Sequence, residues 1–242
     1  MTEQIYIGLA AYNESRNLPI LLERLRKISP QQIIIYDDGS EDDTYDYLTT
    51  QLPKHPIHLL HEPINKGLGY AIGQIIKFAC NTTPEDAVLI LMDADNTHDP
   101  STIIDMLKHI NNGYDVVIAS RYENGAKVKG VSLFRILLSH ACSTLWHLKM
   151  PIHGVKDYSS GYRAYRISTL KKALSKYGED SFVTRNGFEC QLEILAKLKG
   201  IASFTEAPIN LEYDRKASPS SMKIMKAILG HLTLAAKLRN IK

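Results

Sequence analysis

The stretch AVLILMDADNTHD, residues 87–99, decides the fold of this 242-residue chain. A short apolar run containing Val and Ile, followed at once by polar residues, predicts a buried strand of a parallel sheet. Asp93 and Asp95 follow two residues apart, so we expect both on one side of the chain at the carboxyl end of the strand. Ligands bind at this edge of open α/β sheets, and two carboxylates there need a neutralising cation. The stretch therefore predicts a site for a divalent cation that carries phosphate oxygens.

The first half of the chain alternates predicted strands with predicted helices. Strands are expected over residues 5–9, 32–36, 57–61, 87–92 and 116–120. Helices are expected over residues 18–28, 44–50 and 68–79, and after Asp99-Pro100, because proline is favoured at the first helical position. Ser40 and Asp43 resemble a capping box for the second of these helices. The alternation predicts an α/β fold with a doubly wound, mostly parallel sheet flanked by helices.

The second half of the chain is less regular, and two of its predicted helices carry unusual features. The helix expected over residues 131–148 is broadly apolar except for a polar stripe of Arg135, Ser139 and Ser143. A further helix is expected over residues 186–199. The last helix, expected over residues 222–238, is amphipathic, with lysines beside its apolar face. Such a C-terminal helix suits either packing on the domain or a membrane interface.

Composition and charge limit the classes of protein and partner. The net charge is only +3, which gives no general case for binding nucleic acid. Three cysteines, Cys80, Cys142 and Cys190, are far apart and form no metal or disulfide pattern, which favours a reducing cytoplasm. The first residues do not resemble a signal peptide, and no run of about 20 apolar residues predicts a transmembrane helix.

Polar segments follow several of the predicted strands, where a nucleotide could bind. They occupy residues 11–14, 37–40, 65–69, 93–95 and 120–122. Neither the GxGxxG dinucleotide pattern nor the GxxxxGK[ST] phosphate loop is present, which counts against a dehydrogenase and a P-loop NTPase. A nucleotide-sugar site with a DxD metal motif is the remaining common interpretation.

Eight motifs taken together resemble one enzyme family. They are AAYNE (10–14), DDGSEDDT (37–44), NKGLG (65–69), DADNTHDP (93–100), SRY (120–122), FRILLS (134–139), DYSSGYRAYR (157–166) and EYDR (212–215). In this order they resemble family two glycosyltransferases of the GT-A fold, and most of all the dolichol-phosphate mannosyltransferase branch. The resemblance implies a GT-A catalytic domain over residues 1–215 and a C-terminal loop and amphipathic helix over residues 216–242.

The resemblance also implies a role for individual residues. The nucleotide sugar would be bound by Tyr12, Glu14, Asp38, Lys66, Asp93 and Arg215. Asp93 and Asp95 would bring Mg²⁺ or Mn²⁺ to the donor diphosphate. The acceptor phosphate would be held by Arg121 and Arg135, with Ser139 nearby. Asp157 and Ser160 would lie beside the sugar or the acceptor phosphate. The catalytic residues would be Asp95, Arg121 and Arg135.

The family resemblance implies sugar transfer with inversion from a nucleotide sugar to a polyprenyl or dolichyl phosphate. Mannose or glucose is the expected sugar, from GDP-mannose or a UDP-sugar, at the cytoplasmic face of a membrane, with a membrane-protein partner left open. The chemistry agrees, because a phosphate acceptor is already anionic at neutral pH and needs no general base. Catalysis then depends on positioning and on neutralising charge, and arginine suits phosphate because its planar fork donates two hydrogen bonds.

Three alternatives stay open at this point. A saccharide acceptor would need a base, for which Asp157, Glu189 and Glu193 are candidates. The DADNT sequence also fits the DxDxT motif of haloacid-dehalogenase-type phosphatases, in which Asp93 would be the nucleophile, although that motif should follow the first core strand. The third alternative is a non-catalytic nucleotide-sugar binder.

Overall fold

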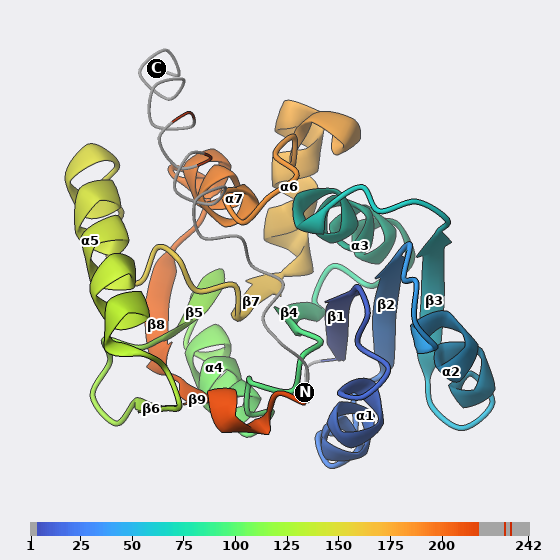
Figure 1. Ribbon diagram of the computed structural model, residues 1–242. Coiled ribbons are helices and arrows are strands. Elements are labelled where there is room, and N and C mark those ends of the chain that lie inside the picture. The colour runs from blue at the N-terminus through green and yellow to red at the C-terminus, as the bar shows by residue number, and fades with distance from the viewer. Residues whose placement is uncertain (1–3, 218–229, 231–232, 234–242) are drawn as a thin grey trace.

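The computed structural model describes residues 4–217, 230 and 233. A seven-stranded sheet forms its centre, in the order β3-β2-β1-β4-β7-β5-β8 (Figure 1). The strands are β1 (Ile5–Ala11), β2 (Gln32–Asp38), β3 (Ile57–Glu62), β4 (Val88–Asp93), β5 (Val116–Ser120), β7 (Arg163–Arg166) and β8 (Phe204–Pro208). A separate pair consists of β6 (Lys127–Lys129) and β9 (Asn210–Glu212). All pairs in the large sheet are parallel except the two made by β7, which confirms the mostly parallel α/β fold.

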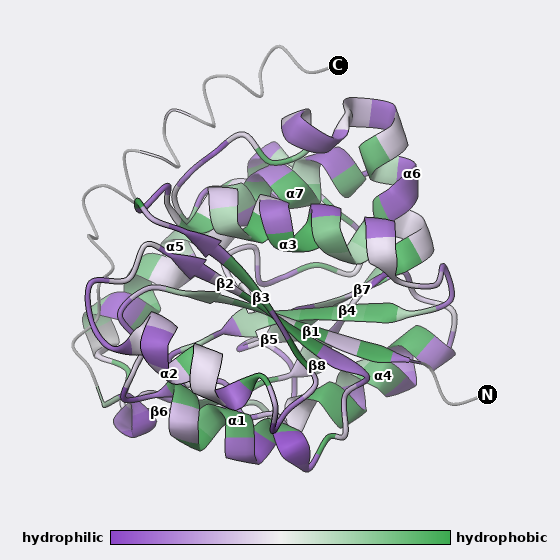
Figure 2. Cartoon of the chain, turned by 90° about the vertical axis from the view of Figure 1, so that its right-hand side faces the viewer, coloured by the Kyte–Doolittle hydropathy of each residue, from purple (hydrophilic) through white to green (hydrophobic). Residues whose placement is uncertain are grey.

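Helices cover both faces of the large sheet (Figure 2). They are α1 (Leu18–Arg26), α2 (Thr44–Gln51), α3 (Leu68–Thr82), α4 (Thr102–Asn111), α5 (Leu133–Lys149), α6 (Ile167–Tyr177) and α7 (Cys190–Leu198). Short 3₁₀ turns occupy Glu179–Ser181 and Tyr213–Arg215. One hydrophobic core joins α3, α5, α6 and α7 to the sheet, and the other joins α1, α2 and α4.

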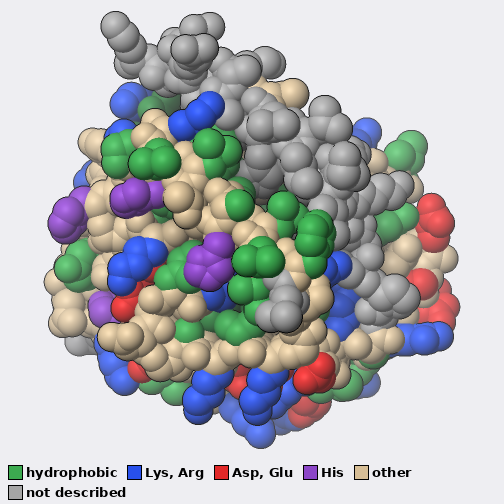
Figure 3. Space-filling view, turned by 60° about the vertical axis from the view of Figure 1, so that its left-hand side comes forward, with side chains coloured by type: hydrophobic (Ala, Val, Ile, Leu, Met, Phe, Trp, Pro, Cys, Tyr) green, Lys and Arg blue, Asp and Glu red, His purple; other side chains and the backbone are tan. Residues whose placement is uncertain are grey.

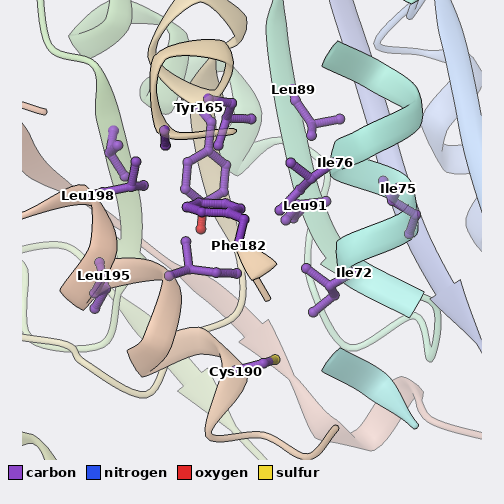
Figure 4. Packing of buried hydrophobic residues seen from close by; sticks show 14 of the residues in the cluster. Ile72, Ile75, Ile76, Leu89, Leu91, Tyr165, Phe182, Cys190, Leu195 and Leu198 are labelled. Carbon is purple, nitrogen blue, oxygen red and sulfur yellow. The ribbon is translucent and has the colours of Figure 1, made fainter. Parts of the chain in front are cut away.

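Strand β4 shows why the apolar run was a reliable signal. Leu89 and Leu91 point into the core shared with α3 and α7 (Figure 4), whereas Val88, Ile90 and Met92 point into the core on the other face. A strand whose two faces are both buried has no polar face to show, so its sequence is continuously apolar. Because β4 lies between β1 and β7, at the centre of the sheet, the residues that follow it lie near the middle of the row of strand carboxyl ends.

The topology gathers the polar segments at this edge. Register places Asp93 beside Ala10 and Asp37 beside Ala11, so the segments after β1, β2 and β4 are neighbours. The loop after β4 is also tied to β9, since the Glu212 N–H donates to the Thr97 carbonyl at 2.9 Å and the Asp99 N–H to the Asn210 carbonyl at 3.0 Å. The late segment EYDR thus lies against the DADNTHD loop.

Most predicted elements of the first half are confirmed to within three residues at their ends, but the capping box is wrong. Ser40 Oγ accepts the Asn13 N–H at 2.9 Å and donates to Asp37, and it makes no cap of α2. Asp43 precedes α2 without a side-chain capping bond. The predicted C-terminal amphipathic helix over residues 222–238 lies outside the described residues. In the part of the chain that is described, no helix is long and apolar enough to cross a membrane.

Candidate active site

The DxD loop, residues 93–99, is a tight turn that aims Asp95. Both the N–H and the Oγ1 of Thr97 donate to Asp95 Oδ1, at 3.1 and 2.7 Å. Asn96 adopts a left-handed conformation with φ of 63°, which Asn tolerates better than most residues, and Arg24 donates to its side-chain oxygen. The Thr97 hydroxyl therefore orients Asp95.

Asp93 is held by a histidine that follows it in the same loop. His98 Nδ1 accepts the backbone N–H of Asp93 at 3.1 Å, so a neutral ring carries its proton on Nε2. That Nε2 lies 3.6 Å from Asp93 Oδ2, and the ring stacks on Tyr162 with 4.7 Å between centroids. Burial raises the pKa of Asp93, and the nearby imidazole opposes this rise. The Nε2–H of His98 therefore lies on the side of the ring that is near the Asp93 carboxylate.

Asp95 is paired with a lysine from the end of the described chain. Lys216 Nζ lies 2.8 Å from Asp95 Oδ2, and the two side chains are only 11% and 14% exposed. Burial alone would raise the pKa of Asp95, but the charge and hydrogen bond of Lys216 outweigh it, so the pKa is lowered. Asp95 is therefore an ionised carboxylate with a cation already beside it.

The chemistry of these donors suits a divalent cation that arrives with phosphate. Within the described residues, no cluster of three or more His, Cys, Asp or Glu side chains forms a complete cation site. Two carboxylates at one strand end are nevertheless what Mg²⁺ commonly uses when substrate phosphates and water complete its shell. Asp93 and Asp95 are thus the residues that could hold Mg²⁺ or Mn²⁺.

A cavity of about 360 Å³ opens beside Asp93. Its polar wall includes Asp93, Arg121, Arg135, Ser139 and Ser159, so two of the predicted arginines share one space with the first aspartate of the DxD motif. The cavity lies between the loop after β4, the loop after β5 and helix α5. Of the predicted nucleotide-sugar residues, only Asp93 lines it.

Arg121 is fixed in this wall by a buried carboxylate. Asp157 has no exposed surface and accepts from Arg121 Nε at 2.8 Å and from Nη2 at 2.7 Å, in a bidentate pair. Ser159 Oγ accepts from the same Nη2 at 2.6 Å. Burial would raise the pKa of Asp157, but the Arg121 hydrogen bonds and charge lower it. Arg121 Nη1 has no hydrogen-bond partner within the described part of the chain, which leaves that nitrogen for a ligand.

Arg135 and Ser139 lie one turn apart on α5, facing this wall. The Arg135 guanidinium lies 5.6 Å from the centre of the Tyr213 ring, at a distance typical of a cation–π contact. Ser139 Oγ lies 3.2 Å from both the Tyr122 hydroxyl and Ser159 Oγ. Two residues of the predicted polar stripe, Arg135 and Ser139, are therefore turned toward Arg121 and the segment 157–160, whereas the third, Ser143, is buried and does not line the cavity.

The rest of the lining includes Thr97, His98, Ser160 and Gln191 together with an apolar stretch that we call the apolar arm. The apolar arm consists of Leu138, Ala141, Cys142, Leu145 and Trp146 of α5 and of Phe188. Leu145 and Phe188 are 37% and 39% exposed, so the apolar arm reaches the protein surface along α5. One space thus combines cationic and apolar side chains.

The predicted nucleotide-binding residues that follow β1 and β2 lie on the side of the DxD loop opposite to β5. Their contacts and burial differ. Burial raises the pKa of Glu14 to about 7, and its carboxylate accepts from Asn17 at 2.6 Å. Asp38 is 3% exposed, and its two oxygens accept the N–H groups of Lys66 and Gly67, each at 2.8 Å. Asp38 therefore holds the NKGLG turn in place, rather than standing open to solvent. Tyr12 is half-buried and Lys66 is exposed.

Arg215 lies on the short turn that follows β9. Its Nε is 2.5 Å from Glu212, and its Nη1 is 3.9 Å from Asp99 in the DxD loop. The side chain is 41% exposed. The structure thus brings Arg215 to the DxD loop, where its partners are carboxylates, and its role at the donor phosphates stays a prediction.

Comparison with known proteins decides the family. The model of glycosyl transferase family 2 matches residues 6–174. The chain belongs to this family. A polyprenol monophosphomannose synthase of Mycolicibacterium smegmatis is 30% identical to this glycosyltransferase over 226 residues, which cover 91% of this chain and 82% of the relative. An undecaprenyl-phosphate mannosyltransferase of Micrococcus luteus is 34% identical over 165 residues, or 67% and 66% of the two chains.

The fold of this glycosyltransferase also has solved counterparts. Glucosyl-3-phosphoglycerate synthase from Mycobacterium tuberculosis, in a complex with Mn²⁺ and UDP, superimposes with a TM-score of 0.65 at 16% identity. The match covers 98% of this chain and 79% of that one. Family membership excludes the phosphatase interpretation of the DADNT motif.

Several residues of the site carry no sequence prediction of their own. Tyr122, Ser159 and Tyr213 contact Ser139, Arg121 or Arg135, and each lies inside a motif that the resemblance already marked. His98 and Lys216 contact the two aspartates. For Lys216, the signal available in the sequence was its position directly after Arg215.

Proposed function

We propose that this glycosyltransferase transfers a sugar, with inversion, from a nucleotide sugar to a polyprenyl phosphate. The observation that carries the proposal is the lining of the 360 Å³ cavity. The cavity combines Arg121, Arg135 and Ser139 beside Asp93 with an apolar arm along α5. A phosphate attached to a long hydrocarbon chain matches both parts of this lining, whereas a free saccharide would leave the apolar arm without a partner.

The donor would lie across the DxD loop. Asp93 and Asp95 would hold Mg²⁺ or Mn²⁺, which neutralises charge on the leaving diphosphate when it is bound. The nucleoside would lie toward Tyr12 and Glu14, behind the turn that Asp38 holds against Lys66. The names of the similar enzymes favour mannose as the sugar, and the Mn²⁺–UDP complex of the structural neighbour supports a divalent cation with a nucleotide.

The acceptor phosphate would be bound by the two arginines. Arg121 is already oriented by Asp157, so its remaining donor, Nη1, is presented at little entropic cost. Arg135 and the Ser139 hydroxyl would complete the phosphate site from α5. Attack by a phosphate oxygen on the anomeric carbon on the face opposite to the diphosphate inverts that carbon, and the anionic nucleophile has no proton to lose.

Two of the three candidate bases for a saccharide acceptor, Asp157 and Glu193, are engaged elsewhere, and the third, Glu189, does not line the cavity. Asp157 is fully buried and bonded to Arg121. Glu193 lies 2.7 Å from Lys197 and accepts from Thr184, and these contacts keep its pKa low despite burial. Neither carboxylate lines the cavity. The arrangement therefore favours an acceptor that needs no base.

The outer face of α5 would rest on the membrane that supplies the acceptor. Phe134, Leu137 and Leu148 are 62%, 68% and 77% exposed there, an unusual density of large apolar side chains for one helix. Figure 3 shows hydrophobic side chains on this side of the molecule above a group of Lys and Arg with some Asp and Glu among them. Such a surface suits the interface of an anionic bilayer, so we propose that residues 1–215 form the catalytic domain and act peripherally at the cytoplasmic face.

Steady-state kinetics of Arg135→Gln tests the acceptor site. A charge-assisted hydrogen bond contributes about 1.5–3 kcal/mol, so the KM for a short polyprenyl phosphate should rise roughly 10- to 100-fold. Donor affinity, measured by calorimetry with the nucleotide, should stay within about twofold of the original. The control is Arg26→Gln, which removes an exposed arginine whose side chain pairs, among the described residues, with Glu23 on α1. Equal losses for donor and acceptor would contradict the proposed division of the site.

A further inference from the structure

The ammonium group of Lys216 is bound to Asp95, one of the two carboxylates that would hold the metal. Lys216 Nζ contacts Asp95 Oδ2 at 2.8 Å, and the other oxygen, Oδ1, accepts both donors of Thr97. Both oxygens of Asp95 are therefore already engaged. The ammonium is also attracted by Asp93 and Glu14, so it lies among three carboxylates.

The segment that carries Lys216 is fastened at both ends. We call residues 213–217 the strap. At its start, Arg215 pairs with Glu212 at the end of β9. At its end, the Ala217 N–H donates to Asn17 Oδ1 at 2.9 Å, which ties the strap to the residue before α1. The strap thus crosses the sheet edge from β9 to the start of α1 and lays its lysine on the DxD loop between them.

Two cations cannot share this carboxylate. A divalent ion within bonding distance of Asp95 Oδ2 would lie a few ångströms from the ammonium, where the site is largely shielded from water and repulsion is strong. The ammonium has to leave before the ion can bind. Leaving breaks a pair whose members are 11% and 14% exposed, which is costly unless new negative charge enters at the same time. A nucleotide diphosphate brings that charge together with the metal.

We propose that Lys216 is an internal substitute for the metal, which closes the DxD site until the nucleotide and the cation arrive together. The inference rests on the proposed role of Asp95 in metal binding. The strap then keeps the free enzyme from binding a divalent cation in the absence of nucleotide. The ion pair between Lys216 and Asp95 thereby sets the order in which the ligands bind. Removing the ammonium should therefore separate metal binding from nucleotide binding.

The test is Mn²⁺ binding to the full chain, measured from the free-ion signal in electron paramagnetic resonance, without nucleotide and with UDP or GDP. Lys216→Met should bind bare Mn²⁺ about tenfold tighter or more than the original chain, in the range usual for coupled sites. With a nucleotide that binds, the difference should shrink to about threefold or less. Thermal unfolding of each variant confirms that it is folded.

Two control variants separate the explanations. Lys127→Met removes an exposed positive charge on β6 without freeing Asp95, so its affinity for bare Mn²⁺ should stay near the original. An equal gain in Lys127→Met and Lys216→Met would overturn the inference, because a general charge effect would explain both. Asp95→Ala should bind less Mn²⁺ than Lys216→Met. If Asp95→Ala loses binding while Lys216→Met matches the original chain, the metal site stands and the inference fails. If Asp95→Ala binds Mn²⁺ as well as Lys216→Met, the metal role itself fails.

Discussion

Replacing Asp157 by Asn should reveal how firmly Arg121 is held. The substitution keeps the shape of the side chain but removes its charge and turns one acceptor oxygen into a donor facing the Arg121 guanidinium. Asp157 is fully buried and also accepts the backbone N–H groups of Arg121, Ser159 and Ser160. The change therefore disturbs both the ion pair and the turn that surrounds it.

The expected loss of stability follows from the burial of the pair. Removing one partner of a buried ion pair costs about 3–5 kcal/mol. The Arg121 side chain keeps 24% exposure toward the cavity and can recover some hydration, so we expect the lower end, about 3 kcal/mol. For a domain of this size that corresponds to a fall in Tm of roughly 6–12 °C, within what a typical domain survives.

Urea unfolding at pH 7 and thermal unfolding measure this loss. Glu123→Gln serves as the control, since its pair with Lys156 at 2.7 Å has side chains 29% and 62% exposed and should contribute about 0–1 kcal/mol. The folded-state pKa of Asp157 is lowered, so its stabilisation is present above the ordinary carboxyl pKa and is lost as pH falls through the lowered one. The difference in unfolding free energy between the original chain and Asp157→Asn should therefore become smaller at acid pH. A difference below about 1 kcal/mol at pH 7 would refute the interpretation that the buried Asp157 holds Arg121 in place.

Three further predictions concern other parts of the fold. Burial raises the pKa of Glu14 to about 7, so ionisation of this side chain destabilises the fold as pH rises from the ordinary carboxyl pKa to about 7. By urea unfolding at pH 8, Glu14→Gln should be about 1–2 kcal/mol more stable than the original chain. Equal stability of the two at pH 8 would contradict this prediction. On α3, a Cβ at Gly69 would lie 1.6 Å from the Arg185 carbonyl oxygen, whereas at Gly73 it would make ordinary contact, so Gly69→Ala should lower Tm sharply and Gly73→Ala should leave it equal or higher. Burial raises the pKa of Cys142 to about 11, so this thiol should react slowly with a disulfide reagent at pH 8 until the protein is unfolded.

The parts of the fold that follow local rules could be predicted from the sequence. The β4 run, the helices of the first half and the convergence of strand ends all depend on periodicity and on parallel topology. Strand β7 could not be predicted, because four residues, RAYR, form a strand only by pairing antiparallel with β4 and β5, which are distant in the chain. Its insertion at that place is a property of the assembled sheet.

The sequence indicated which residues could form the site, but not their contacts. The resemblance implied that Asp93 serves the donor and that Arg121, Arg135 and Ser139 serve the acceptor phosphate. The cavity brings these side chains together, and their roles stay predictions. The pairing of Lys216 with Asp95 spans 121 positions of the chain, and neither side chain signals the other in the sequence. The sequence likewise gives no sign that Asp157 pairs with Arg121, because this pair forms only through tertiary contacts.

Sugar transfer to a lipid phosphate is the central claim, and a labelled-donor assay tests it most directly. The full chain is incubated with Mn²⁺ or Mg²⁺ and radiolabelled GDP-mannose, UDP-glucose or UDP-N-acetylglucosamine, together with a short polyprenyl phosphate. Parallel reactions contain polyprenol, which lacks the phosphate, in place of the polyprenyl phosphate as the matched control, and a third set uses the Asp95→Ala variant. The account predicts that one donor sends label into the organic phase with the phosphate alone, and that Asp95→Ala abolishes it. Equal label with polyprenol, or undiminished transfer by Asp95→Ala, would contradict it.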